Sequence, residues 1–273
     1  MKNSVLAVLV ARAASKGALT PVRGRSPSQV PQHSLGAGQY AVIFALLVTC
    51  ACGLQPTTPH GSDSANTRGE DELCRMLQDR PEMAYMVERG DPIWTWAIER
   101  YSGMTTGIPI NWSAVQPRGS AGADHSVSPW FDSAEMRIRS YESPPPVGEN
   151  PKRAFDVQWS RAAFEFFNLE NARAYDALRT RVLVGALDRD GWIRGVANLE
   201  YIALRKKADF YKASWSHWMQ ARRIRSNPAL WGVSIPDSYE EWLSTFTNPQ
   251  GYPWGVYGPD YDRLIAGKRM NSK

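Results

Sequence analysis

The fold is decided by residues 155–226, which read FDVQWSRAAFEFFNLENARAYDALRTRVLVGAL over 155–187 and DRDGWIRGVANLEYIALRKKADFYKASWSHWMQARRIRS over 188–226. Apolar residues recur at helical spacing in both halves, which predicts two amphipathic helices. The first stripe consists of Phe164, Phe167, Asn171, Tyr175, Leu178 and Val182, and the second of Ile193, Ala197, Leu204, Ala208, Tyr211, Trp215 and Trp218. Asp156 is expected to cap the first helix and Asp188 or Asp190 the second, so that a short link makes an antiparallel helical hairpin.

The flanking segments add smaller elements. Residues 71–103 predict two short helices with Pro81 and Pro92 in their first turns. Residues 108–112 and 134–139 predict strands, and the polar stretch from Ser113 to Asp132, which contains Asp124 and His125, predicts a long loop. A capping box at 238–241 predicts a small helix, and the aromatic residues of 252–261 are expected in a final loop, of which 252–257 is the candidate for an exposed segment. Residues 71–273 are therefore predicted to form a single, mainly helical α+β domain.

The net charge of +5 does not indicate a nucleic-acid-binding protein. Of the 32 Lys and Arg residues, five lie in residues 1–49, which contain no acidic residue, so that 27 basic residues meet 27 acidic ones after residue 49. The net basicity belongs to the leader, and the rest of the chain is balanced. We expect no nucleic-acid partner. The cluster Arg222, Arg223 and Arg225 is interpreted as the solvated end of a helix.

Residues 1–52 have the pattern of an export leader. The apolar run 41–48 is eight residues long, too short for a spanning helix and typical of a signal peptide. Leu47-Val48-Thr49-Cys50 resembles the lipobox of bacterial lipoproteins, in which a cysteine receives a lipid. The resemblance implies lipid attachment at Cys50 or Cys52, a palmitate-bearing membrane anchor, and a place in the cell envelope facing the periplasm or the exterior. Residues 53–70, rich in Pro, Thr, Ser and Gly, are expected to be a disordered tether.

Other interpretations of the leader stay open. A second short apolar run, Val5 to Val10, precedes Ala11-Arg12-Ala13 and fits a separate secretory cleavage site. The acid-free stretch to residue 39 also fits an organellar transit peptide, and a start further along the chain would leave a cytoplasmic protein. Cys74 is the only other cysteine, so neither a disulfide framework nor a paired-cysteine zinc site is expected.

Glu165 and Asn168 are the first candidates for chemistry. Glu165 stands among Phe164, Phe166 and Phe167, and burial raises the pKa of a carboxyl group toward the range of a general base. The segment faintly resembles the H-E-x-x-H helix of zinc metallopeptidases, with Phe164 and Asn168 in place of both histidines. That resemblance implies at most a degenerate relative without the metal. The alternative is a buried, charged Glu165 paired with Lys206 or Lys207.

Glu200 is the second candidate, because it interrupts the apolar stripe of the second helix. In an antiparallel hairpin, Glu165 would face Phe210 and Glu200 would face Tyr175, which puts the two carboxylates about 15 Å apart along the axis. That is too far for a glycosidase pair. Glu200 is instead expected to bind Tyr175 or Arg173.

The remaining candidates are weaker. His125 and His217 show no metal-ligand spacing, and no metal or cofactor is predicted. All eleven tryptophans lie between Trp94 and Trp254, where they can serve a core, an interface or a sugar-binding surface. Two functions follow. The first is an envelope-anchored lipoprotein that binds an envelope protein or glycan without catalysis, or has a structural role. The second is a hydrolase-like domain using Glu165.

Overall fold

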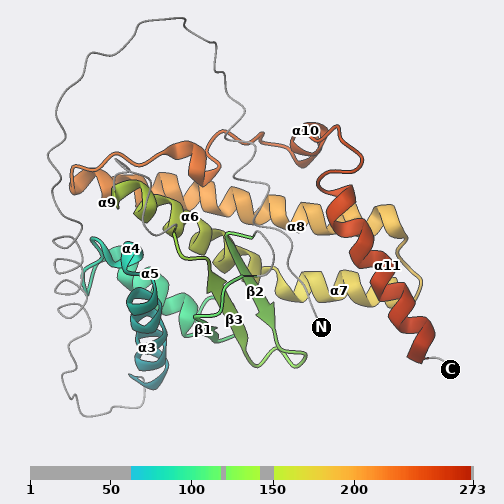
Figure 1. Ribbon diagram of the computed structural model, residues 1–273, viewed down its shortest axis with the longest axis horizontal. Coiled ribbons are helices and arrows are strands. Elements are labelled where there is room, and N and C mark those ends of the chain that lie inside the picture. The colour runs from blue at the N-terminus through green and yellow to red at the C-terminus, as the bar shows by residue number, and fades with distance from the viewer. Residues whose placement is uncertain (1–62, 118–120, 142–150, 272–273) are drawn as a thin grey trace, which may run out of the picture.

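The computed structural model describes residues 63–117, 121–141 and 151–271. These residues form a mainly helical α+β fold with one small sheet, as the sequence predicts (Figure 1). The leader, both candidate lipidation cysteines and tether residues 53–62 lie outside the described residues. Within the described ranges, no helix is both long enough and apolar enough to cross a bilayer.

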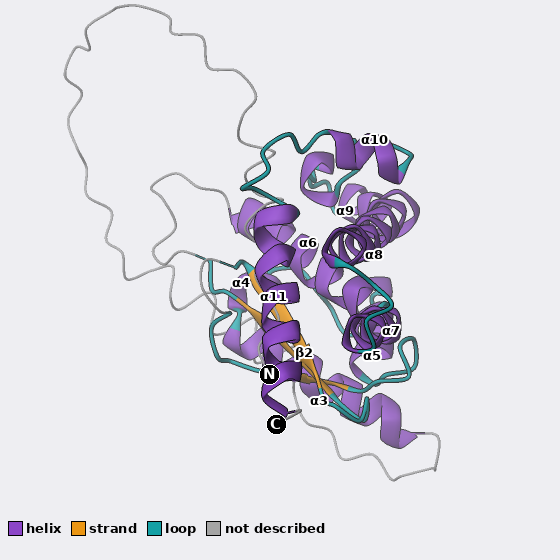
Figure 2. Cartoon of the chain, turned by 90° about the vertical axis from the view of Figure 1, so that its right-hand side faces the viewer, coloured by secondary structure: helices purple, strands orange, loops and turns teal. Residues whose placement is uncertain are grey.

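Helix α6, Pro151–Glu170, is the centre of the fold. It packs against α8, Arg189–Phe210, on one side and against strands β2, Ala123–Val127, and β3, Ala134–Ile138, on the other (Figures 1 and 2). Residues 162–169 are all buried, including the three phenylalanines around Glu165. A helix that is apolar on most of its surface needs partners on both faces, which explains its position between a helix layer and a sheet.

The two long helices expected in residues 155–226 are broken in the structure. α6 ends at Glu170 and α7 covers Ala172–Leu183. At the break, the side chain of Asn171 donates a hydrogen bond to the carbonyl of Leu199 on α8 (2.8 Å). An asparagine side chain that bonds backbone groups competes with helix continuation, so the break coincides with this cross-helix contact.

The second half is also segmented. Asp188 caps α8 through Gly191, as one of the two expected caps, and α8 ends at Phe210. A π-helix, Tyr211–Trp215, and a short α9, Ser216–Ala221, follow in place of one continuous helix. Asn227 then opens a 3-10 helix, Pro228–Trp231. The wider π turn places Trp215 fully inside the core beside Phe155.

The sheet contains a strand that the sequence analysis placed in a loop. β1 (Ile110–Trp112) and β3 (Ala134–Ile138) occupy the expected segments. β2 (Ala123–Val127) arises from the segment expected to be a loop, and the strand order is β1-β3-β2. β1 pairs with β3 in parallel and β2 pairs with β3 in antiparallel register. The inner face of the sheet covers α6, and its outer face is polar.

The N-terminal helices cover the β1 side of the sheet. α3 spans Asp63–Asp79, α4 spans Pro81–Ala84 and α5 spans Pro92–Tyr101. The helix α3 therefore includes residues 63–70, which were expected in the disordered tether. Glu72 of α3 accepts the backbone N–H of Trp112 (2.7 Å), which satisfies a donor at the edge of the sheet.

The C-terminal segment corrects another expectation. α10, Tyr239–Ser244, has Ser238 as its N-cap, as predicted from the capping box. Residues from Trp254 onward form α11, Trp254–Asn271, which packs across α7 and α8, in place of the expected final loop. Tyr252 and Tyr257 are buried. The glycines and Pro259 of this segment have a low helix propensity. Burial of Tyr252 and Tyr257 against α8 stabilises the helix despite that low propensity.

Candidate functional site

Glu165 is buried and pairs with His125. Its residue is 2% exposed, and its carboxylate Oε2 lies 2.7 Å from Nδ1 of His125 on β2. The predicted burial of Glu165 is confirmed, whereas the predicted partner, Lys206 or Lys207, is wrong. His125 lies on β2, in a segment that the sequence predicted to be a loop, so the sequence did not indicate that the partner would come from the sheet. The His125 side chain is about one quarter exposed, so the pair reaches from the core toward the surface.

Lys206 and Lys207, the two expected partners of Glu165, contact other residues. Lys206 binds Glu170 at 2.8 Å near the surface. Lys207 is fully buried, and its Nζ donates to the carbonyl of Leu230 (2.9 Å) and lies 3.3 Å from Oγ of Ser160. Burial lowers the pKa of Lys207 to about 7, while the charge of Glu165 opposes that shift. Glu165 thus has a long-range electrostatic effect on Lys207, and its short contact is with His125.

Asn168 does not complete a metal site. Its amide nitrogen is buried without a hydrogen-bond partner in the described part of the chain. Residues 63–117, 121–141 and 151–271 contain no group of three or more His, Cys, Asp or Glu side chains placed to hold a metal ion. His217 lies exposed on α9, separate in sequence and environment from Glu165 and His125. The resemblance to the metallopeptidase helix therefore has no counterpart in these surroundings.

Glu200 forms a second buried site, which also corrects the sequence analysis. It accepts hydrogen bonds from the hydroxyl groups of Tyr252 (2.5 Å) and Tyr257, whereas the expected partners were Tyr175 and Arg173. Burial raises the pKa of Glu200 to about 8, and the two tyrosine hydrogen bonds only partly oppose the shift. This carboxyl group joins α8 to the C-terminal segment. Arg173 instead stacks over the ring of Phe131.

Asp156 has a role that the sequence analysis missed. It was expected to cap a helix, but α6 begins five residues earlier, and Asp156 lies buried inside it. Its carboxylate accepts the indole N–H groups of Trp215 (2.9 Å) and Trp231 (2.8 Å). It also accepts the Ser226 hydroxyl and the Asn227 backbone N–H, both at 2.7 Å. This carboxylate holds the π-helix and the 3-10 helix against α6.

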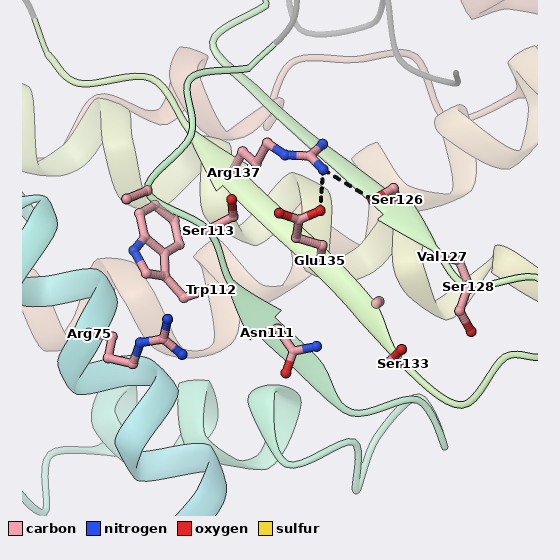
Figure 3. Close-up of a pocket in the computed structure, with 12 residues that line it drawn as sticks. Arg75, Asn111, Trp112, Ser113, Ser126, Val127, Ser128, Ser133, Glu135 and Arg137 are labelled. Atoms are coloured by element: carbon pink, nitrogen blue, oxygen red, sulfur yellow. Dashed lines mark hydrogen bonds and ion pairs between the residues drawn. The ribbon is translucent and has the colours of Figure 1, made fainter. Parts of the chain in front are cut away.

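A polar groove lies on the outer face of the sheet, and we call it the sheet groove (Figure 3). Its volume is about 670 Å³. Asn111, Glu135 and Arg137 project from the floor in Figure 3, and Ser113 and Ser126 flank Glu135. Its further lining residues are Arg75, Trp112, Ala114, Val127, Ser128, Ser133 and Ala134. Polar hydrogen-bonding groups thus converge on a surface that solvent can reach.

The charged groups on the floor of the groove are held by one another. The guanidinium group of Arg137 binds Asp124 (3.2 Å) and Glu135, and one of its nitrogens lies 3.4 Å from the Ser126 hydroxyl. Hydrogen bonds from Ser113, the charge of Arg137 and further hydrogen bonds outweigh desolvation and lower the pKa of Glu135. Glu135 is therefore an ionised acceptor at neutral pH, fixed in position yet partly exposed. The period-two alternation of residues 134–139 was the sequence signal for this polar face.

Compared with protein-family models, with curated proteins and with solved structures, the chain matches none.

Proposed function

We propose that the protein is an envelope-anchored lipoprotein whose folded part binds a partner without catalysing a reaction. The observation that carries the non-catalytic part is the environment of Glu165. A hydrolase needs its general base within reach of a substrate proton. Glu165 is instead buried among phenylalanines, and its carboxylate is engaged by His125.

The sheet groove supports the binding part of the proposal. It combines fixed hydrogen-bonding side chains with access to solvent, which is the usual composition of the polar part of a binding site. The anchoring part rests on the resemblance of residues 47–50 to a lipobox. A domain that is anchored by a lipid and binds a partner accounts for both the lipobox-like segment and the sheet groove.

Metabolic labelling with an alkyne analogue of palmitate tests the anchor. The full chain is expressed in a bacterial host beside single Cys50→Ala and Cys52→Ala variants and the double variant. We expect label on the wild-type chain and none on the double variant, and the single variants identify the modified cysteine. An unlabelled wild-type chain, or a labelled double variant, would overturn the anchor.

One observation favours a second function. A carboxylate that binds Nδ1 of a histidine can orient the ring so that its other nitrogen acts as a general base. The His125–Glu165 contact has this form, with the histidine on the side nearer to solvent. A hydrolase-like domain would then use His125 as the base and Glu165 as the residue that positions it. The free energies of unfolding of Glu165→Ala and Glu165→Gln distinguish this function from the non-catalytic one.

A further inference from the structure

We infer that the sheet groove, together with the exposed Trp130, binds a neutral glycan strand of the cell envelope. The inference rests on the proposed partner-binding function and names the chemical class of the partner. Three observations carry it: the charge balance of the groove, the hydroxyl-rich lining, and an exposed indole on the turn that ends the groove.

The charge balance disfavours an anionic ligand. Arg75 is paired with Glu72, and Arg137 is paired with both Asp124 and Glu135. Arg68 donates a hydrogen bond to Asn111 and adds a third arginine beside the groove. Three arginines thus meet three carboxylates, so a phosphate or a carboxylate ligand would meet no surplus of positive charge. A neutral ligand does not face that penalty.

The lining matches a ligand rich in hydroxyl groups. Glu135 presents a fixed carboxylate that accepts hydrogen bonds. Arg68 donates a hydrogen bond to the side-chain carbonyl oxygen of Asn111 (2.8 Å). The side-chain N–H₂ group of Asn111 therefore points away from Arg68, where it can donate to a ligand. The hydroxyl groups of Ser113 and Ser126 donate to Glu135, and those of Ser128 and Ser133 donate to Asp132. Their oxygen lone pairs remain to accept hydrogen bonds from a ligand. Sugars offer closely spaced hydroxyl groups that are both donors and acceptors, so each type of group in the groove finds a complement.

The turn between β2 and β3 presents the indole. Trp130 is 85% exposed and lies between Ser128 and Ser133, two residues that line the groove. Its neighbour Phe131 packs against the core under Arg173 and has a φ of 57°, a conformation that is costly for a residue with a side chain. The strained Phe131 anchors the turn while Trp130 remains in solvent. The apolar C–H face of a sugar ring packs on such an exposed indole, and its hydroxyl groups remain free for the groove.

Binding of a defined neutral sugar tests the inference. The full mature chain, purified in detergent, is titrated by calorimetry with chitotetraose and is sedimented with purified peptidoglycan sacculi. We expect both to bind. Trp130→Ala and Glu135→Gln should each weaken chitotetraose binding by about tenfold or more, since each removes a stacking surface or a charged hydrogen-bond acceptor. Val184→Ala, which truncates another exposed apolar side chain at the end of α7, is the matched control and should bind as the wild type does.

The outcomes separate this inference from the proposed function. Absence of chitotetraose binding, with or without binding to sacculi, would overturn the glycan inference, because the peptide stems of sacculi carry charges that chitotetraose lacks. Chitotetraose binding that Trp130→Ala and Glu135→Gln leave unchanged would also overturn it. Circular dichroism of each variant confirms that a loss of binding is not a loss of fold. If the wild type binds chitotetraose but also cleaves it, the glycan inference holds and the non-catalytic function falls.

Discussion

The Glu165 carboxylate of α6 lies 2.7 Å from Nδ1 of His125 on β2, and this contact joins the central helix to the sheet. The acid is buried and the imidazole is partly exposed. On the opposite side of α6, Lys207 of α8 is buried close enough for the charge of Glu165 to act on its pKa. Ionisable groups from three elements therefore share one region of the core, and their protonation affects the stability of the fold.

Glu200 should make the protein less stable as the pH rises from about 4.5 to about 8. Its pKa is raised from 4.5 to about 8 in the folded chain, so the folded state keeps a proton that the unfolded state loses in this range. The contribution is fully present below pH 4.5 and is lost as the pH passes 8. Glu200→Gln replaces the protonated form by a neutral side chain, and it should flatten this part of the curve. Urea unfolding at a series of pH values measures the change, and an unchanged slope in the variant would argue against it.

Lys207 should have the opposite effect at higher pH. Its pKa is lowered from 10.5 to about 7 in the folded chain, so the unfolded state binds more protons between these values. The contribution of Lys207 to the free energy of unfolding should therefore increase as the pH rises from about 7 to 10.5. Lys207→Met should remove this contribution, whereas Lys206→Met, which removes a partly exposed surface pair with Glu170, should keep it. The same pH series checks both variants, and a rise that survives in Lys207→Met would contradict the assignment.

Asp156 should be among the most sensitive positions for stability. Asp156→Ala removes the acceptor of the Trp231 indole N–H, the Ser226 hydroxyl and the Asn227 backbone N–H, and it leaves the Trp215 indole N–H only the Ser226 oxygen at 3.2 Å. We expect a loss of at least about 3 kcal/mol in the free energy of unfolding, because unsatisfied buried donors are costly. Asp176→Ala, which removes an exposed pair with Arg179, should cost about 1 kcal/mol or less. Denaturant unfolding measures both variants. Equal losses would show that the buried network contributes little.

The sequence predicted the features that depend on local periodicity. Apolar spacing located the helices of residues 155–226, and alternation located β3. The segment of β2 was assigned to a loop because Asp124, His125 and Ser126 are all polar. In the folded chain Asp124 binds Arg137 and His125 binds Glu165, thirteen and forty residues further along. Contacts at that separation leave no periodic trace in a five-residue strand.

The sequence predicted the burial of the candidate site residues but not their partners, because those partners are distant in the sequence. The phenylalanines around Glu165 correctly indicated its burial. Its partner was sought only on the facing helix, since a hairpin was the only tertiary contact that the sequence specified. For Glu200, the partners Tyr252 and Tyr257 belong to a segment whose glycines and Pro259 favour a loop. Packing against α8 overrides that local preference.

The central claim is that Glu165 stabilises the fold through His125. Its most direct test is a double-mutant cycle in which Glu165 and His125 are replaced and the free energy of unfolding of the protein is measured. If Glu165 serves the fold, Glu165→Ala should cost about 3 kcal/mol, because it breaks a buried pair and leaves Lys207 without its nearby carboxylate. The double variant Glu165→Ala, His125→Ala should then lose less than the sum of the single losses, with a coupling of about 1–3 kcal/mol. Glu165→Gln keeps the shape and can be measured if the alanine variant does not fold. If Glu165→Ala or Glu165→Gln is at least as stable as the wild type, the structural role is contradicted and the pair is kept for a reaction, because active-site residues are often held at a cost to stability.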